Sequence, residues 1–216
     1  MAEKKLSKKA LNKSFRNWAY GNLTCFSQEH MQTFGYLCAM LPLVEELYDT
    51  KEEQKEAMNT YTAFFNTEPQ VGSIIVGITA GLEEAKANGN EDIDAEAING
   101  IRAGLMGPLA GIGDTISWST LMYLFIGLFL PLAKQGNPLG GIGPIVLLTV
   151  ICFGIGYFLT SKCYTFGYSF AENMLKSGLI NMIITGASIL GLFMMGGLAA
   201  TYVTVSTPIK FVTSTY

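Results

Sequence analysis

The feature that most limits how this chain can fold is a series of long apolar stretches in its second half. Three stretches carry no charged residue and contain 18, 22 and 27 residues: Thr115–Leu132, Leu139–Thr160 and Leu179–Val205. A helix needs about 20 apolar residues to cross the ~30 Å hydrocarbon core of a bilayer. The turn-forming segment Lys134–Pro138 separates the first two stretches. We therefore expect an all-α integral membrane protein in which the first two transmembrane helices form a hairpin.

The composition and the distribution of charge agree with a membrane location. Charged residues make up only 14% of the chain and hydrophobic residues 50%, which excludes an intrinsically disordered chain. From Asp114 to Tyr216 there are only six charged residues, whereas the acidic residues concentrate between positions 45 and 96. Basic residues cluster only near the N-terminus, so we expect no nucleic-acid partner.

The N-terminal segment carries six basic residues within its first 16 positions. In residues 6–24 apolar side chains recur about every 3.6 positions, which predicts a basic amphipathic helix that lies on the lipid bilayer or on a partner. Polar residues follow Arg16 where a signal peptide would have an apolar region, so we do not expect this segment to be a signal peptide. The excess of basic residues predicts that this end lies in the cytoplasm, with Lys162 and Lys176 on the same side and Lys134 on the other.

Between these regions lie apolar stretches that are too short to cross a bilayer. They are Met31–Val44, Val71–Leu82 and Leu105–Gly113. Such stretches are typical of re-entrant helices, which are tolerated at membrane depth only where protein or a water-filled cavity covers the backbone. Glycines spaced four apart, which let helices approach closely, occur at 77/81, 100/104 and 107/111.

The more polar segments of this middle region give further expectations. Glu45–Met58 predicts a solvated helix, and Asp94 is placed to cap a helix over Ala95–Leu105. We expect three regions: the amphipathic helix 1–24, a polar and re-entrant region 25–113 with helical hairpins, and a transmembrane region 114–216.

Few residues in the chain could carry out chemistry. The four cysteines, Cys25, Cys38, Cys152 and Cys163, form no C-x-x-C pair, and His30 is the only histidine. This pattern predicts neither a metal site nor a cofactor, and it leaves the chain without a credible nucleophile. We therefore expect no catalytic residues.

Two polar motifs stand in apolar surroundings, where polar groups mark functional sites in membrane proteins. The first is Asn66-Thr67-Glu68-Pro69, immediately before the short apolar segment 71–82, and the second places Asp114 and Trp118 at the start of the first transmembrane stretch. Carboxylate and amide groups could bind a hydroxyl-rich ligand. The alternative is that Asn66, Glu68 and Asp114 cap helix ends, and that Trp118 is an interfacial anchor.

Three strings resemble the IID component of mannose-type sugar phosphotransferase systems. They are FFNTEPQVGSIIVGITAGLEE, IRAGLMGPLAGIGDTI and KCYTFGYSFAENMLKSGLINMIITGASILGLFMMGG. The resemblance runs from about Phe15 to the end of the chain. Family members continue for some tens of residues beyond a position like Tyr216, so we expect the chain to be truncated and the number of spans to stay open.

The resemblance implies a specific function and specific partners. A IID chain pairs with a IIC chain in the bacterial cytoplasmic membrane, and the pairs assemble into a trimer. Together they bind and translocate a hexose, which a IIB protein, charged through IIA, phosphorylates. The chain is then a multi-pass permease subunit that is not catalytic by itself, and Asn66, Thr67, Glu68, Asp114 and Trp118 are the candidate sugar-binding residues.

Two other classes of function compete with this interpretation. One is a membrane scaffold or receptor subunit that transports nothing itself, since family members also serve as docking surfaces for bacteriocins or phage. The other is a membrane-embedded enzyme that uses Asp114 and Glu68 as acid and base. The second would need a nucleophile, a metal or another convergent polar set, which the sequence does not show.

Overall fold

The computed structural model describes residues 4–174 and the isolated positions 189, 196, 200 and 203. The regular elements of this part are helices. They are α1 (Lys8–Thr24), α2 (Thr33–Leu47), α3 (Lys51–Asn59), the 3-10 turn η1 (Thr60–Thr62), α4 (Ser73–Ala87), α5 (Ala95–Asp114), the π-helical segment η2 (Thr115–Leu121), α6 (Met122–Lys134) and α7 (Leu139–Met174). The predicted third transmembrane stretch, Leu179–Val205, lies outside the described residues apart from those four isolated positions.

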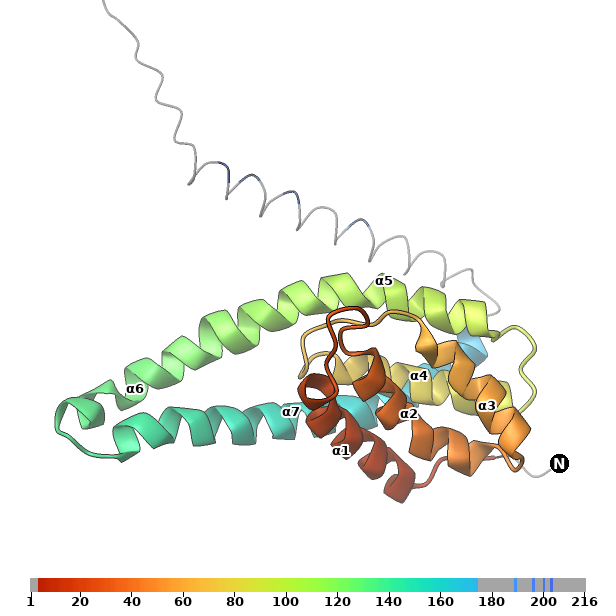
Figure 1. Cartoon of the computed structure of the whole chain (residues 1–216), viewed down its shortest axis with the longest axis horizontal. Helices are drawn as coiled ribbons and strands as arrows, with labels where there is room; N and C mark the ends of the chain where they lie inside the picture. Colours follow the sequence, from red (N-terminus) through yellow and green to blue (C-terminus); the bar gives the residue numbers. More distant parts are fainter. Residues whose placement is uncertain (1–3, 175–188, 190–195, 197–199, 201–202, 204–216) are drawn as a thin grey trace, which may run out of the picture.

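Two long helices form an arm that extends away from the rest of the protein (Figure 1). Within the described residues, Ala95–Lys134 and Leu139–Gly167 are long and apolar enough to cross a membrane. The turn between them contains Gly136, whose φ of +74° suits a residue without a Cβ atom. The predicted helical hairpin is confirmed, and the regular structure of the described residues is helical, as expected.

The first long helix also corrects an expectation. Leu105–Gly113 was expected to be a separate short helix, but α5, η2 and α6 form one 40-residue helix from Ala95 to Lys134. Asp94 caps this helix as predicted, because its Oδ1 accepts a hydrogen bond of 2.7 Å from the Ala97 amide. The glycines of this region favour a break, but none of them ends the helix, since the backbone hydrogen bonds continue through a π-helical turn.

Helices α1 to α4 form a head at one end of the arm (Figure 1). Its core includes Tyr36, Leu43, Ile75 and Leu82, all completely buried. Helix α4 lies in the middle of the head, and its residues from Ser73 to Ala85 are buried except for Ile74. A 15-residue helix covered on all sides by protein satisfies the condition under which a short apolar helix is tolerated in a membrane protein.

Helix α1 belongs to the core of the head. Its indole Trp18 is completely buried, and a Cβ atom on Gly35 of α2 would lie 2.6 Å from the Gly21 carbonyl oxygen of α1. The two backbones are therefore in direct contact. The basic residues of α1 stay on its exposed side, so the predicted amphipathic helix is present and its apolar side packs on protein.

The polar helix expected over Glu45–Met58 is divided in two. Helix α2 ends at Leu47, and α3 begins after Thr50, whose side chain forms a capping box with Glu53. Tyr48 is extended and interrupts the helix. The capping box explains the break, because it satisfies the first amides of a new helix at this point.

Two buried acidic residues of α4 tie the head together. Glu83 accepts hydrogen bonds from the hydroxyl groups of Tyr48, at 2.7 Å, and Tyr61. Glu84 accepts bonds of 2.6 Å from both the Leu6 amide and the Tyr164 hydroxyl of α7. Bonds of this kind let a carboxylate be buried.

The glycine pairs behave differently from one another. A Cβ atom on Gly77 of α4 would lie 2.5 Å from the Thr160 carbonyl oxygen of α7, so this glycine permits the contact between the two helices. A Cβ atom on Gly107 of α5 would have no described atom within 4 Å. The spacing therefore predicted a close helix contact at Gly77 and failed to do so at Gly107.

Candidate functional site

The segment from Phe65 to Gly72 connects η1 to α4 and is fixed from several sides. The Thr67 amide donates to Gln32 Oε1 at 2.9 Å, and the Thr67 hydroxyl donates to the Met106 carbonyl of α5 at 3.1 Å. On the opposite side, Trp18 Nε1 donates to the Pro69 carbonyl at 2.7 Å. Helices α1 and α5 and the segment before α2 thus hold one extended loop in place.

A buried arginine supports the start of this loop. Arg102 of α5 donates to the carbonyl oxygens of Thr60, at 3.1 Å, and Ala63, at 3.3 Å. Its guanidinium carbon lies 4.6 Å from the centre of the Tyr36 ring and 5.4 Å from that of Phe65. Desolvated cation–π contacts of this kind stabilise a buried guanidinium.

Glu68 is the most constrained residue of the loop. Its side chain is 2% exposed, and one oxygen, Oε2, accepts a bond of 2.7 Å from the Val71 amide. Gly113 lies directly beneath it, since a Cβ atom there would be 2.6 Å from Oε2. The other oxygen, Oε1, is buried and accepts no hydrogen bond from the described residues.

The environment of Glu68 raises the pKa of its carboxyl group. Burial raises the pKa of the carboxyl group above its ordinary value of 4.5, and the negative charge of Asp114 raises it further. The backbone amides of Val71 and Gln70 and the hydroxyl of Ser117 act in the opposite direction but do not offset the burial.

The second motif lies across from the loop, where the long helix changes to π-helical geometry. Asp114 ends α5 and is exposed, and Trp118 within η2 is 43% exposed. Ser117, between them in sequence, is buried. Single π-helical turns are frequent at functional sites, because they redirect side chains that a regular helix would place elsewhere.

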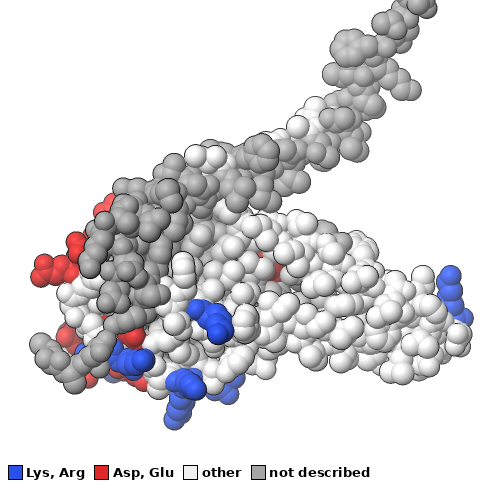
Figure 2. All heavy atoms as spheres, turned by 180° about the vertical axis from the view of Figure 1, so that it is seen from behind, with Lys and Arg blue, Asp and Glu red and all other residues white. Residues whose placement is uncertain are grey.

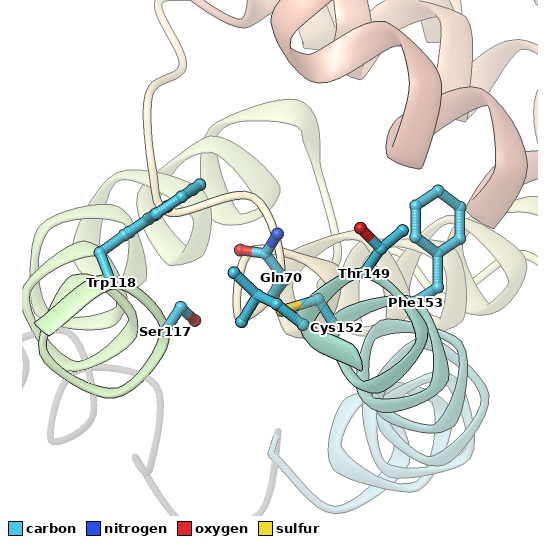
Figure 3. A pocket seen from close by; sticks show the side chains of 7 residues that line it. Gln70, Ser117, Trp118, Thr149, Cys152 and Phe153 are labelled. Atoms are coloured by element: carbon cyan, nitrogen blue, oxygen red, sulfur yellow. The ribbon is translucent and has the colours of Figure 1, made fainter. Parts of the chain in front are cut away.

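A cavity of about 130 Å³ lies between η2, the loop and α7 (Figure 3). Its lining residues are Gln70, Ser117, Trp118, Leu148, Thr149, Cys152 and Phe153. The volume is several times the ~10–15 Å³ that one water needs. Gln70 lies between the two helices in Figure 3, and its Oε1 is buried without a hydrogen-bond donor among the described residues.

Of the five predicted site residues, Trp118 lines this cavity, and Asn66, Thr67, Glu68 and Asp114 are not among its lining residues. Thr67 and Glu68 are buried in the loop, Asp114 lies close enough to Glu68 to affect its pKa, and Trp118 lines the cavity. Asn66 is exposed, and its backbone N–H donates to the Met106 sulfur at 3.0 Å. Sequence reasoning passed over Gln70, Ser117 and Thr149. Gln70 stands two positions after Glu68, so the motif itself was the available signal, whereas Thr149 comes from the middle of an apolar stretch.

The described residues contain no group of three or more histidine, cysteine, aspartate or glutamate side chains that could hold a metal ion. His30 packs edge-on against Phe34, with ring centres 5.5 Å apart. The candidate site is instead built from hydroxyl, amide and carboxyl groups and one indole. Groups of these kinds hydrogen-bond a polyhydroxy ligand and stack on its apolar face.

Comparison with known proteins gives a consistent result. Residues 5–216 match the family model described as "PTS system mannose/fructose/sorbose family IID component". The mannose-specific EIID component of Escherichia coli K12 is 40% identical over 182 residues, covering 84% of this chain and 64% of that protein. The fructose permease IID component of Bacillus subtilis 168 is 37% identical over 209 residues, covering 96% of this chain and 74% of the relative.

Solved structures show the same similarity in three dimensions. A chain in the cryo-EM structure of the mannose transporter ManYZ with microcin E492 matches with a TM-score of 0.84 and 38% identity, covering 91% of this chain and 71% of that one. A second match, a structure described only as a membrane protein, has a TM-score of 0.69 and 37% identity, over 90% of this chain and 71% of the other. The present chain therefore spans a little under two thirds of the E. coli relative and somewhat more of the others.

Proposed function

Because the chain belongs to the family of IID membrane components of mannose/fructose/sorbose phosphotransferase systems, we propose that it pairs with a IIC subunit to bind and translocate a hexose. In this proposal the complex lies in the bacterial cytoplasmic membrane as a trimer of IIC–IID pairs. A IIB protein, recharged by IIA, phosphorylates the sugar. The chain crosses the membrane several times with its N-terminus in the cytoplasm, and it is not catalytic by itself.

One observation carries the proposal for the site. Glu68 Oε1 and Gln70 Oε1 are buried acceptors without donors among the described residues, and Gln70 lines the cavity. An unsatisfied buried acceptor costs about 1–3 kcal/mol, so it favours a ligand that supplies donors. Sugar hydroxyls are such donors, and Trp118 at the cavity wall offers a face on which a sugar ring can stack.

Asn66, Thr67 and Asp114 have different parts in this proposal. Asn66 is exposed, and its side chain supplies both a donor and an acceptor to the sugar. Thr67 positions the loop, because its hydroxyl already donates to the Met106 carbonyl. The negative charge of Asp114 raises the pKa of Glu68. Its exposed carboxylate is also available to accept a hydrogen bond from a sugar hydroxyl.

The experiment is sugar binding by the chain with and without its IIC subunit. The two chains are co-expressed and purified, and the melting temperature is measured with mannose, fructose, sorbose and, as a control, glycerol. We expect one of the hexoses to raise the melting temperature of the assembled pair, with no such shift for the IID chain by itself.

The other two classes of function predict different results. A scaffold or receptor subunit would show no sugar-dependent shift of the melting temperature in the assembled pair. A membrane-embedded enzyme would convert a substrate without the IIC subunit. Either result would contradict the proposed function.

A further inference from the structure

An open groove lies between helices α1 and α7 on the side of the head. It shares no lining residue with the candidate sugar cavity. It is lined by Lys9, Asn12, Phe15, Arg16 and Tyr157 and has a volume of about 570 Å³. The first four residues come from α1 and the last from α7. Helix α1 therefore contributes two cations, one amide and one aromatic ring, and α7 contributes a second aromatic ring.

The cations of this groove have no counter-ion in the described part of the chain. Lys9 and Arg16 are exposed and form no ion pair with any described residue, whereas the neighbouring Lys13 lies 3.9 Å from Glu45 and Lys4 lies 3.4 Å from Asp49. Figure 2 shows basic side chains gathered along one edge of the head, while the visible face of the arm carries few charged side chains. Two uncompensated cations thus face the same groove.

The position of the groove along α7 indicates its depth in the membrane. Leu139 follows the polar turn at the tip of the arm, and Tyr157 lies 18 residues later, a distance of about 27 Å at 1.5 Å per residue. That is close to the ~30 Å thickness of the hydrocarbon core. Lys162 extends over the Phe158 ring, 5.8 Å from its centre, as a lysine does when it reaches toward an interface. The groove therefore lies near the end of the uncharged stretch Leu139–Thr160, on the side opposite the tip.

We propose that this groove binds the headgroup of an anionic phospholipid. Lys9 and Arg16 donate to the phosphate, Asn12 hydrogen-bonds the polar headgroup, and the glycerol backbone lies against Phe15 and Tyr157. Tyr157 is 47% exposed, which leaves the acyl chains free to follow the apolar surface of α7 into the bilayer. The lipid would hold α1 against α7 and so attach the head to the arm.

The test uses the full-length protein purified with any subunits that accompany it. Native mass spectrometry measures the binding of phosphatidylglycerol and of phosphatidylcholine with the same acyl chains. We expect phosphatidylglycerol to bind more tightly, and the double variant Lys9→Ala/Arg16→Ala to weaken its binding by about tenfold or more, since each basic residue near an anionic headgroup contributes about a factor of five.

A matched control removes the same charge from outside the groove. Lys5→Ala/Lys8→Ala takes two exposed lysines from the same end of the chain and should keep nearly all the preference for phosphatidylglycerol. Lys9→Arg should keep it as well, and all variants should melt at the same temperature before lipid is added. Equal losses in both double variants would overturn the proposal, because they indicate a diffuse charge effect.

Three other results would also overturn it. If both lipids bind equally, the groove does not recognise anionic headgroups. Equal competition by glycerol 3-phosphate would show a site for a free phosphate compound. Loss of an accompanying subunit from the Lys9→Ala/Arg16→Ala variant, with lipid binding unchanged, would show a protein interface.

Discussion

At Glu68 the two carboxylate oxygens have different surroundings. Oε2 caps the turn before α4 through the Val71 amide, while Oε1 is buried without a donor among the described residues. Capping a helix and binding a ligand were alternatives for this residue on sequence grounds. The geometry makes them compatible, because one oxygen serves the backbone and the other is left for a ligand.

The pKa of Glu68 gives a prediction for pH dependence. Its pKa is raised above 4.5 in the folded protein, so between 4.5 and the folded value the folded state holds a proton that the unfolded state releases. The free energy of unfolding must therefore fall as the pH rises through this window. Glu68→Gln resembles the protonated form and lacks this loss. We therefore compare the melting temperature of the variant with that of the original protein at two pH values. The difference, variant minus original, should be larger at about pH 8 than at about pH 5. A difference that is constant or reversed would contradict the assigned pKa.

A second prediction at this scale concerns the glycine beneath Glu68. In Gly113→Ala the new methyl group collides with the Glu68 side chain, so we expect a loss of about 1–3 kcal/mol in stability. Gly107→Ala in the same helix is the control, because its methyl group meets no described atom and should stabilise the helix by about 0.5–1 kcal/mol. Thermal unfolding of both variants measures the difference, and equal effects would show that the Gly113 contact is absent.

At the scale of elements, local sequence signals predicted the helix ends better than the connections between helices. Asp94 capped the helix that it was expected to cap, and Gly136 lies in the turn that separates the two transmembrane helices. These features depend on side chains within a few residues of one another. The continuous helix from Ala95 to Lys134 was not predicted, because its glycines are compatible with either a break or a helix and only the surrounding contacts decide.

In the candidate site, too, some residues could be predicted from local sequence and others could not. Asn66, Glu68, Asp114 and Trp118 were recognisable as polar or amphipathic residues in apolar surroundings. Thr149 lines the cavity from the middle of α7 and was hidden, since its hydroxyl donates to the Ile145 carbonyl as any helical threonine can. Finding it required knowing which face of α7 turns toward the loop.

Helix α1 provides a prediction at this scale. Trp18 is completely buried and bonded to the Pro69 carbonyl, so Trp18→Ala should destabilise the protein by about 3–5 kcal/mol and release the loop that carries Glu68. Leu23→Ala removes an apolar side chain from the exposed side of the same helix and should change stability by less than about 0.5 kcal/mol. Thermal unfolding in detergent measures both. If the two variants melt alike, α1 is a surface helix and not part of the core.

On the scale of the whole molecule, the arm is the part whose apolar surface is least covered by the described residues. Exposed apolar side chains cover α6 and α7, among them Leu128, Leu130, Ile145 and Val150. Some of this surface faces lipid, and we infer that part of it faces the IIC subunit. The buried head and the apolar arm together suit a subunit whose attachment to a partner runs along the arm.

This arrangement predicts how the chain behaves without a partner. The IID chain expressed by itself should aggregate or elute as a broad peak in size-exclusion chromatography, whereas co-expression with a IIC subunit should give a single sharp peak. The reason is that an apolar surface shaped for protein contact packs poorly against detergent. A monodisperse and heat-stable preparation of the single chain would argue against an obligate pair.

The central claim is that Asn66 and Glu68 bind sugar in the assembled complex, and one measurement tests it most directly. Isothermal titration of the complex with its preferred hexose is compared for the original protein, Glu68→Gln and Asn66→Ala, with the melting temperature measured in parallel. The account predicts that assembly and melting temperature hold while affinity falls at least about tenfold in each variant, the loss of one strong hydrogen bond. Unchanged affinity, or a loss of binding that only accompanies a loss of stability, would show that these residues cap the loop and that the sugar site lies elsewhere.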